Sequence, residues 1–385
     1  MDTSKFTESK TGDLVPIVTP KGPDHAFLPY NLPPGWRIPG HLWPKVAEAR
    51  AAVAKLDGIG ATLPDQELLL SPLKTREAIT SSRIEGTYAT VQELMLFELD
   101  PQEPKSSHDQ INSRREVSNY AKALTAGIGQ LEKLPFCGMV IRDLHSILMD
   151  GVRGQHSIPG TWRNVQIAIG SNWRFVPPPP TELQNCIDAF ESYVKEDASN
   201  DYDPLVRAYL AHYQFEAIHP FVDGNGRIGR VILSLMIAKW CKLSQPWLYM
   251  SSFFEKYKEE YVTNMFKVSA EGAWETWVDF CLTGTIHQAN DAIQRCAKLI
   301  KLKAEMLARG HSGSIRAERI INGLFSSPFV RVSNLHKKLG VSYPTAQSDI
   351  DRLEKLNILK PLPNLRPKCY YSPEIYEIAF AEQNA

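Results

Sequence analysis

The sequence lacks the features that mark membrane-spanning and secreted proteins. No apolar run approaches the roughly 20 residues needed to cross a bilayer, and the first ten residues are polar, without a signal-peptide core. The six cysteines form no Cys-x-x-Cys pair and have no histidine partner at zinc spacing. The net charge of zero gives no global attraction to nucleic acid or anionic lipid. We therefore expect a cytoplasmic protein with reduced thiols and no membrane association.

What the chain does contain is enough residues for two or three domains and a dominant helical pattern. Its 385 residues show no internal repeat. We expect an N-terminal region over residues 1–106, a helical core over 107–305 and a smaller unit over 306–385. Residues 1–40 are rich in proline and glycine, which predicts an extended segment that lies on the surface or packs over a neighbour and forms no core of its own. The predicted fold class is mainly α.

One N-terminal helix is predicted over about residues 72–86. Ser71-Pro72 combines an N-cap residue with a proline in the first turn, and Gly86 is a typical C-terminal stop. A short β-hairpin, or flap, is predicted further on. Its strands are Val165–Ile169 and Arg174–Val176, joined through Gly170-Ser-Asn172.

The C-terminal unit has the pattern of a winged helix-turn-helix. Two short helices, over Val332–Leu339 and Tyr343–Leu356, flank Gly340, and a strand-like pattern follows from Ile358 to Tyr371. Such a unit can bind DNA or contact a protein. The acidic residues of its second helix match DNA phosphate poorly, whereas polar residues near the start of that helix suit base contacts. Both alternatives stay open; the acidic residues are Asp349, Asp351 and Glu354.

The strongest signal is the segment His219-Pro-Phe-Val-Asp-Gly-Asn-Gly-Arg-Ile-Gly-Arg230, which lies between two predicted helices. Glycines on both sides of an asparagine let backbone N–H groups converge as an anion nest at a helix N-terminus. Arg227 and Arg230 share one helix face and offer forked donors to phosphate. Asp223 is a hard oxygen ligand suited to Mg²⁺, and His219 suits general-base work. Together these groups indicate phosphoryl-type transfer.

At every fixed position this segment resembles the Fic family motif, His-x-Phe-x-Asp/Glu-Gly-Asn-Gly-Arg-x-x-Arg. Further similarities are Ile141-Arg-Asp-Leu-His145, Gly151-Val-Arg-Gly154, Gly160-Thr-Trp-Arg163 and His212-Tyr-Gln-Phe-Glu216, so the likeness extends over roughly residues 30–290. The resemblance implies a Fic helical core and a protein adenylyltransferase, with ATP and a protein hydroxyl as substrates and Mg²⁺ as cofactor.

The resemblance also implies a role for each motif residue. His219 would take the proton of the target hydroxyl, and Asp223 would hold Mg²⁺ on the α- and β-phosphates. Arg230 would hold the γ-phosphate, and Glu216 would tie down the loop backbone. The remaining implied contacts are nucleotide contacts by Gly224, Asn225, Gly226, Arg227, Gly229 and Tyr261, and target pairing along the flap by Ile169 and Gly170.

Ser81-Ser-Arg-Ile-Glu85-Gly86 resembles the inhibitory motif of the same family, Ser/Thr-x-x-x-Glu-Gly/Asn. A glutamate in the last helical turn opposes the helix dipole unless a cation meets it. The resemblance names Arg230 as that cation, so Glu85 would occupy the γ-phosphate position. Ser81, one turn earlier, is placed to hydrogen-bond to the glutamate. An N-terminal, intramolecular brake is the implied regulation.

Three functions remain to be separated at this point. The first is AMP transfer from ATP to a serine, threonine or tyrosine hydroxyl, including self-modification. The second is another Fic reaction: transfer of a different nucleotide or of phosphocholine, phosphorylation, or AMP removal. The third is a DNA-binding regulator that acts through residues 306–385. A homodimer is also open, because many two-domain members of the family dimerise.

Overall fold

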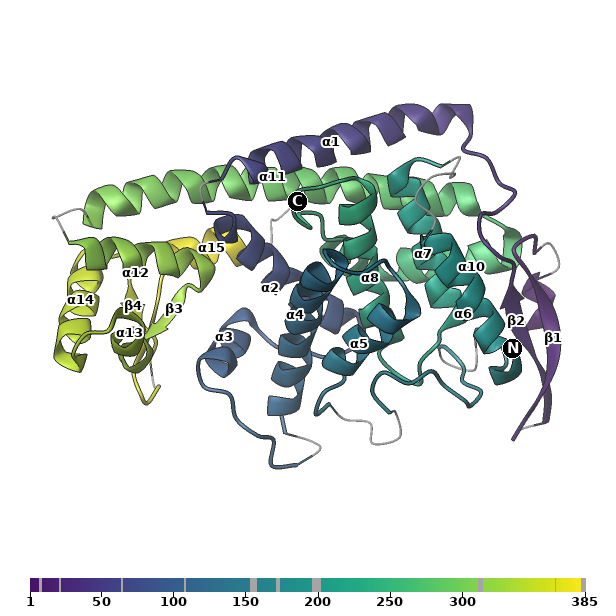
Figure 1. The fold of residues 1–385 in the computed structure, drawn as a ribbon, viewed down its shortest axis with the longest axis horizontal. Coiled ribbons are helices and arrows are strands. Elements are labelled where there is room, and N and C mark those ends of the chain that lie inside the picture. The colour runs from purple at the N-terminus through teal and green to yellow at the C-terminus, as the bar shows by residue number, and fades with distance from the viewer. Residues whose placement is uncertain are drawn as a thin grey trace.

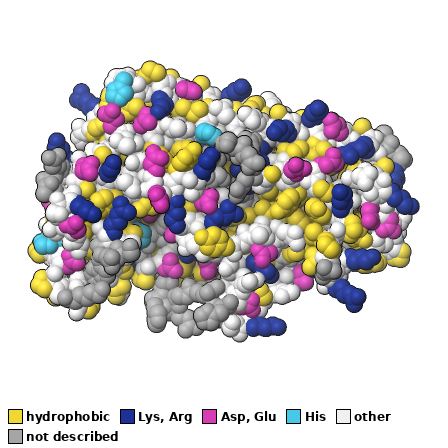
Figure 2. Space-filling view, turned by 180° about the vertical axis from the view of Figure 1, so that it is seen from behind, with side chains coloured by type: hydrophobic (Ala, Val, Ile, Leu, Met, Phe, Trp, Pro, Cys, Tyr) yellow, Lys and Arg dark blue, Asp and Glu magenta, His cyan; other side chains and the backbone are white. Residues whose placement is uncertain are grey.

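The protein is described from a computed structural model, which covers residues 1–385 except 7–8, 21, 64, 107–108, 153–157, 171–173, 196–201, 311–313, 364 and 382–385. The fold is mainly helical with two small antiparallel sheets, as expected for a Fic helical fold (Figure 1). Among the described residues, no helix is both long and apolar enough to span a bilayer. Basic and acidic side chains are mixed over the face seen in Figure 2, in keeping with the net charge of zero.

Among its described residues, the first half of the chain holds a β-hairpin, six α-helices and two short 3-10 turns, one before the hairpin at Thr3–Phe6 and one after it at Gly40–Leu42. The elements are β1 (Gly12–Thr19), β2 (Gly22–Pro29), α1 (Trp43–Ala61), α2 (Glu67–Ile84), α3 (Val91–Leu99), α4 (Ile111–Leu131), α5 (Gly138–Leu148) and α6 (Pro180–Lys195).

The second half continues as helices and ends in a small mixed unit. Its elements are α7 (Pro204–Ile218), α8 (Asn225–Trp240), α9 (Ser251–Lys256), α10 (Lys258–Glu271), α11 (Trp274–Gly310), α12 (Ile315–Ser326), β3 (Phe329–Arg331), α13 (Val332–Leu339), α14 (Tyr343–Lys355), β4 (Lys360–Pro361), β5 (Cys369–Tyr371) and α15 (Pro373–Phe380).

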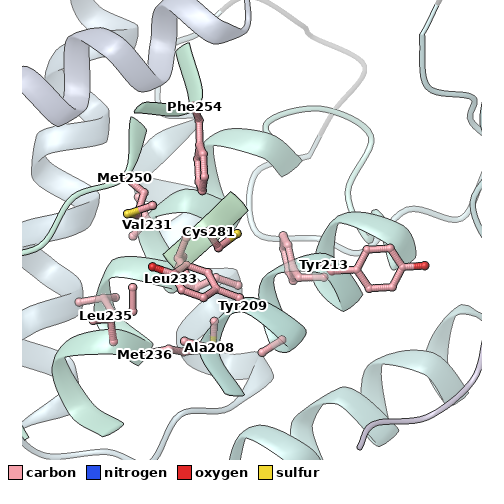
Figure 3. Packing of buried hydrophobic residues seen from close by; sticks show 14 of the residues in the cluster. Ala208, Tyr209, Tyr213, Val231, Leu233, Leu235, Met236, Met250, Phe254 and Cys281 are labelled. Atoms are coloured by element: carbon pink, nitrogen blue, oxygen red, sulfur yellow. The ribbon is translucent and has the colours of Figure 1, made fainter. Parts of the chain in front are cut away.

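Helices α7 and α8 lie at the centre of the main core. Successive residues from Leu205 to Phe215 of α7 are buried, so this helix is surrounded on all sides. Figure 3 shows Tyr209 and Tyr213 of α7 and Leu233 and Met236 of α8 among the residues of one buried hydrophobic cluster. Because the loop between these two helices holds residues 219–224, the motif starts from a helix that is buried on all sides.

Helix α11 connects this core to the C-terminal unit. It runs beside α1 for much of its length (Figure 1). Its first part contributes to the main core up to Cys296, and Leu299, Leu302 and Met306 pack with α12 to α14 instead. The helix therefore passes through the expected division at residue 305. The C-terminal unit itself contains the two helices around Gly340 and a three-stranded antiparallel sheet in the order β3-β5-β4.

Residues 1–40 are extended and pack on a neighbouring part of the chain, which is one of the two placements expected, but their pairing as a hairpin was not predicted. Strands β1 and β2 pair in register from Gly12 with Pro29 to Thr19 with Gly22. Phe27 is 0% exposed, and its ring lies 5.7 Å from that of Phe6 and 5.6 Å from that of Phe175. Its backbone N–H donates to the carbonyl of Val176 at 2.8 Å. The N-terminal hairpin thus joins the main core and supports the base of the flap.

Two other boundaries differ from the expectation. Helix α2 begins at Glu67, so Pro72 lies inside it rather than at its start. The earlier start is explained by Leu68, Leu69 and Leu70, whose burial holds the added turn against the cores. The flap is reduced to one antiparallel bridge between Ile169 and Phe175 among its described residues, and Ser171 and Asn172 of the expected turn lie outside them.

Replacing Phe27 by alanine tests the structural role of the hairpin. We expect the free energy of unfolding to fall by about 3–5 kcal/mol, the usual cost of emptying a buried phenylalanine site. Val18→Ala is the matched control, because that side chain on β1 is 87% exposed and should change stability little. Denaturant unfolding measures both. Equal, small losses for the two variants would contradict the packing of the hairpin on the core.

Candidate active site

The loop between α7 and α8 is held by side chains from three places. Asn225 closes the loop on itself, because its Oδ1 accepts from Phe221 N and its Nδ2 donates to Phe221 O, both at 2.8 Å. Arg163 is buried and donates from Nε to the carbonyl of His219 at 2.8 Å. His145 bridges Gly160 N, at 2.9 Å from its Nδ1, and Asp223 O, at 3.0 Å from its Nε2. The path of the loop is thus fixed by one side chain of the motif, that of Asn225, and by two from outside it, those of Arg163 and His145.

The imidazole ring of His145 is neutral and bridges two segments of the backbone. Burial lowers its pKa to about 4. The amide of Gly160 donates to Nδ1, so the remaining proton sits on Nε2 and is given to the Asp223 carbonyl. The ring also stacks on Phe221, with centroids 3.6 Å apart. One imidazole therefore fixes both the loop backbone and the phenylalanine that anchors it.

His219 is oriented as a base. It caps α7 in the left-handed region, at φ 48°, a conformation that a non-glycine residue adopts at a cost. Burial lowers its pKa to about 4, so the imidazole is neutral at pH 7. Its Nδ1 lies 3.1 Å from the carbonyl of Glu216, which can only accept, so the proton occupies Nδ1. The unprotonated Nε2 is left to take a proton from another group.

The carboxyl group of Glu216 does not tie down the loop as expected. Its Oε1 is buried without a hydrogen-bond partner among the described residues. Burial raises its pKa to about 8, although the charge of Arg230 acts in the opposite direction. The loop backbone is held instead by Arg163, His145 and Asn225. Glu216 also lies so close to α8 that only glycine fits at position 229, because a Cβ there would lie 2.1 Å from Glu216 Oε1.

The N-cap and first turn of α8, from Gly224 to Arg227, have the features of an anion-binding site, which we call the anion seat. Gly224 precedes the helix in the left-handed region at φ 79°, and a Cβ there would lie 2.9 Å from Met149 Sδ. The first amides of the helix have no intrahelical partner and point out of its positive end. Arg227 lies in the same turn. Its Nη1 is 3.2 Å from Glu116 of α4, and its Nη2 is 3.6 Å from Asp223.

A carboxylate of the chain itself occupies this seat. Glu85 Oε1 accepts from Arg230 Nη2 at 2.8 Å, and a Cβ on Gly226 would lie 2.2 Å from the same oxygen. Burial alone would raise the pKa of Glu85, but the charge and hydrogen bond of Arg230 outweigh it and hold that pKa below its usual value. The guanidinium of Arg230 is 2% exposed. Glu85 therefore lies where a phosphate oxygen would meet the first turn of α8.

The predicted site residues come together around one cavity of about 630 Å³. It is lined by the motif from His219 to Arg230, by Glu85, by Tyr261 and by Ile169 and Gly170 of the flap. Tyr261 forms part of the inner wall, with its hydroxyl 2.8 Å from His212 Nε2. Two predicted residues do not line the cavity. Gly229 faces Glu216, and Ser81 bonds to Arg230 rather than to Glu85.

Sequence reasoning missed four residues that hold the site, all outside the motif. Arg163 and His145 were visible as parts of similar segments, without a role. Glu116 links the segment after α2 to the anion seat, because its Oε2 accepts from Thr87 Oγ1 at 2.6 Å as well as from Arg227. Lys258 lines the cavity and donates from Nζ to the carbonyl of Ile84. Nothing in the local sequence distinguishes Glu116 or Lys258 from surface residues.

Comparisons with known proteins agree with this site. The sequence matches the model described as Fic/DOC family N-terminal over residues 43–129 and that of the Fic/DOC family over residues 136–237. Protein adenylyltransferase Fic of Drosophila grimshawi is 36% identical over 80 residues, which are 21% of this chain and 16% of that protein. The match to the Drosophila melanogaster protein of the same name is 35% over the same shares. The chain thus aligns with only a small part of these relatives.

Solved structures show the same fold at low sequence identity. A Fic family protein from Desulfovibrio desulfuricans G20 superposes with a TM-score of 0.57 at 19% identity, over 89% of this chain and 98% of that one. A Fic domain containing signaling protein from Bacteroides thetaiotaomicron gives 0.53 at 17% identity, over 65% of this chain and 97% of that one. Motif, matched regions and fold agree, and the chain is a member of the Fic/DOC family.

Proposed function

We propose that the protein transfers AMP from ATP to a serine, threonine or tyrosine hydroxyl of a target protein, and to itself. The observation that carries the proposal is a neutral, oriented base beside an anion seat in one cavity: His219 stands on one side, and the first turn of α8 with Arg227 and Arg230 on the other. The name of the partly matched Drosophila relatives supports the same reaction.

In the proposed reaction, Nε2 of His219 takes the proton of the target hydroxyl. The freed oxygen then attacks the α-phosphorus in line. A new P–O bond forms to the target, the bond from the α-phosphorus to the bridging oxygen breaks, and pyrophosphate leaves. The helix N-terminus, with Gly224, Asn225, Gly226 and Arg227, would hold the phosphates. Arg230 would meet the γ-phosphate once Glu85 has left.

Asp223 suits a magnesium ion shared with the substrate. Its side chain is 52% exposed, and the described residues contain no cluster of three or more His, Cys, Asp or Glu that could form a protein-only metal site. Mg²⁺ is commonly held by one or two carboxylates together with substrate phosphates, which fits a single carboxylate at the mouth of the anion seat. When bound there, Mg²⁺ would neutralise charge on the α- and β-phosphates.

The flap would pair with the target along Ala168. Both backbone groups of Ile169 are already used, since its N–H donates to Phe175 O at 2.8 Å and its carbonyl accepts from Phe175 N at 3.2 Å. Adjacent residues of a strand direct their backbone groups to opposite sides. The outward groups next to the bridge therefore belong to Ala168, because Gly170 lies in the left-handed region at φ 78° and does not continue the strand; this moves the expected pairing away from Ile169 and Gly170.

We propose that Glu85 is an intramolecular brake on this reaction. The support is its carboxylate on Gly226 and Arg230, because that position and the γ-phosphate exclude each other. The intact glutamate also keeps AMP removal as an alternative reaction, in which it would position a water molecule. Mass spectrometry of the Glu85→Gly variant, incubated with each nucleoside triphosphate and a candidate target, separates AMP transfer from transfer of another group.

Glu85→Gly is expected to raise AMP incorporation at least about tenfold, which corresponds to roughly 1.4 kcal/mol on the barrier. The reason is that Arg230 loses the competing carboxylate. Labelled AMP from ATP is counted on the protein itself and on added extract. Glu255→Gly is a suitable control. Glu255, on α9, forms an ion pair at 3.7 Å with Arg83 of α2, the helix whose C-cap is Glu85, and not with Arg230. An unchanged rate in Glu85→Gly would refute the brake.

The reaction should keep its rate down to about pH 5 when measured in the Glu85→Gly variant. His219 acts as a base only when neutral, and burial lowers its pKa to about 4, so protonation abolishes activity only toward that pH. Removing Glu85 removes a carboxylate that raises this pKa, which shifts the limit further down. His219→Ala should abolish transfer at every pH and leave ATP binding intact. Loss of half the rate near pH 6.5, the value of an ordinary histidine, would contradict the assignment.

DNA binding by residues 306–385 is a second candidate function, and one observation favours it. Asp349, which weighed against DNA in the sequence, is buried and pairs with Arg316 at 2.9 Å. Its charge is therefore turned away from any ligand of α14. Basic residues of the unit are exposed at the end of α13 and around the β4–β5 connection: Lys337, Lys338, Lys360, Arg366 and Lys368.

A gel-shift titration of the whole protein with duplex DNA tests this second candidate. We expect binding at about 50 mM salt that weakens steeply as salt rises, because phosphate contacts release counterions. Lys337→Glu with Lys338→Glu should weaken it. Lys301→Glu, an exposed position on α11, should not. No shift at low salt would reject DNA binding and leave the unit as a protein-contact module.

A further inference from the structure

Arg230 is held mainly by a serine rather than by the glutamate of the brake. Its Nε donates to Ser81 Oγ at 2.8 Å, and its Nη2 donates to the carbonyl of Ser81 at 2.9 Å. Only the third bond, from Nη2 at 2.8 Å, goes to Glu85. The sequence-based expectation placed Ser81 on Glu85. The structure shows instead that Ser81 would keep two of these three bonds to Arg230 if Glu85 left.

The helix that carries Ser81 is fixed independently of Glu85. One turn before Ser81, Glu77 is buried and accepts from Tyr120 Oη at 2.9 Å and from Ser251 N at 3.0 Å, which ties α2 to α4 and to the start of α9. At its other end, Lys258 donates to the carbonyl of Ile84. Loss of the Glu85 carboxylate breaks none of these contacts, so α2 stays in place.

Ser81 and Glu85, the two residues of the inhibitory motif, differ in solvent exposure. Ser81 is completely buried, whereas the side chain of Glu85, at the C-cap of α2, is 40% exposed. Rotation of the glutamate side chain is therefore enough to vacate the anion seat. The guanidinium would then keep its orientation through Ser81, with Nη1 against the first turn of α8. A Cβ on Gly226 would lie 3.1 Å from this Nη1.

We propose that Ser81 is a positioning residue for nucleotide binding, which holds Arg230 in the orientation that receives the γ-phosphate after Glu85 has moved away. The proposal rests on the proposed function, which gives Arg230 that phosphate. Helix α2 then has two opposite duties. Ser81 orients Arg230 for the γ-phosphate, and Glu85 occupies Arg230 until the glutamate side chain moves away.

The test compares ATP and ADP binding, because only ATP has the phosphate that Arg230 would meet. Dissociation constants are measured by calorimetry with Mg²⁺ on the full chain. In the Glu85→Gly variant, ATP should bind more tightly than ADP. Adding Ser81→Ala should weaken ATP binding about tenfold, equal to about 1.4 kcal/mol, and leave ADP binding unchanged. Unchanged ADP binding also reports that the fold and the rest of the seat are intact.

Ser82→Ala is the matched control. Ser82 is the next residue on α2, is equally buried, and its Oγ has no hydrogen-bond partner among the described residues. In the Glu85→Gly background this change should leave the ratio of ATP to ADP affinity as it was. Ser81→Thr, which keeps a hydroxyl at the position, should preserve the ATP preference that Ser81→Ala removes.

Two results of the binding measurements would contradict the proposed role of Ser81. An ATP preference that survives Ser81→Ala would overturn the proposal, and so would parallel losses for ATP and ADP. If Ser81 served only the brake, Ser81→Ala would raise AMP transfer in the otherwise unchanged protein and have no effect beside Glu85→Gly. Failure of Glu85→Gly to transfer AMP would refute the transferase, yet the ATP-to-ADP comparison would still report on Ser81.

Discussion

The site depends on a buried cation that an anionic partner stabilises. Arg230 is almost completely buried, and a buried guanidinium without a counter-charge is strongly destabilising. In this structure Glu85 supplies the charge, and the two groups shift each other's pKa toward the ionised forms: that of Arg230 upward and that of Glu85 downward, both against the effect of burial. A triphosphate can take over only by providing the same charge. Exchange between glutamate and phosphate follows from the burial of one arginine.

Most of what lies inside the motif could be predicted from the sequence because it is local. The end of α7 at His219, the nest at Gly224 and the start of α8 all follow from the residues before proline and around glycine. The place of Glu85 at the end of α2 was equally predictable, because Gly86 after it is a typical helix stop. What holds these parts in place was not visible. Arg163, Glu116 and Lys258 reach the site through contacts between distant parts of the chain, and no spacing in the sequence encodes those contacts.

The N-terminal hairpin shows the same limit from the other side. Proline and glycine predicted an extended segment, on the surface or packed over a neighbour, but they did not predict that β1 pairs with β2 or which side chain enters the core. Whether Phe27 is buried depends on Phe6 and Phe175, which lie at the two ends of the first half of the chain. Within the motif, likewise, composition did not tell which side chains face the ligand. Asn225 faces its own loop. Just before the motif, Glu216 places its carbonyl oxygen 3.1 Å from His219 Nδ1 and a carboxyl oxygen 3.9 Å from the same atom.

The buried carboxyl group of Glu216 bears on the proposed brake, because it also lies near Arg230. This second carboxyl lies within the same buried region as Arg230, and Gly229 gives it the space to do so. If it were ionised, Arg230 would already have a permanent counter-charge, and Glu85 would add little. Burial raises the pKa of Glu216 to about 8, so the group is mostly uncharged at pH 7. The positive charge of Arg230 is thereby left for one anion at a time, which is the condition under which a side chain on α2 and a phosphate can compete for it.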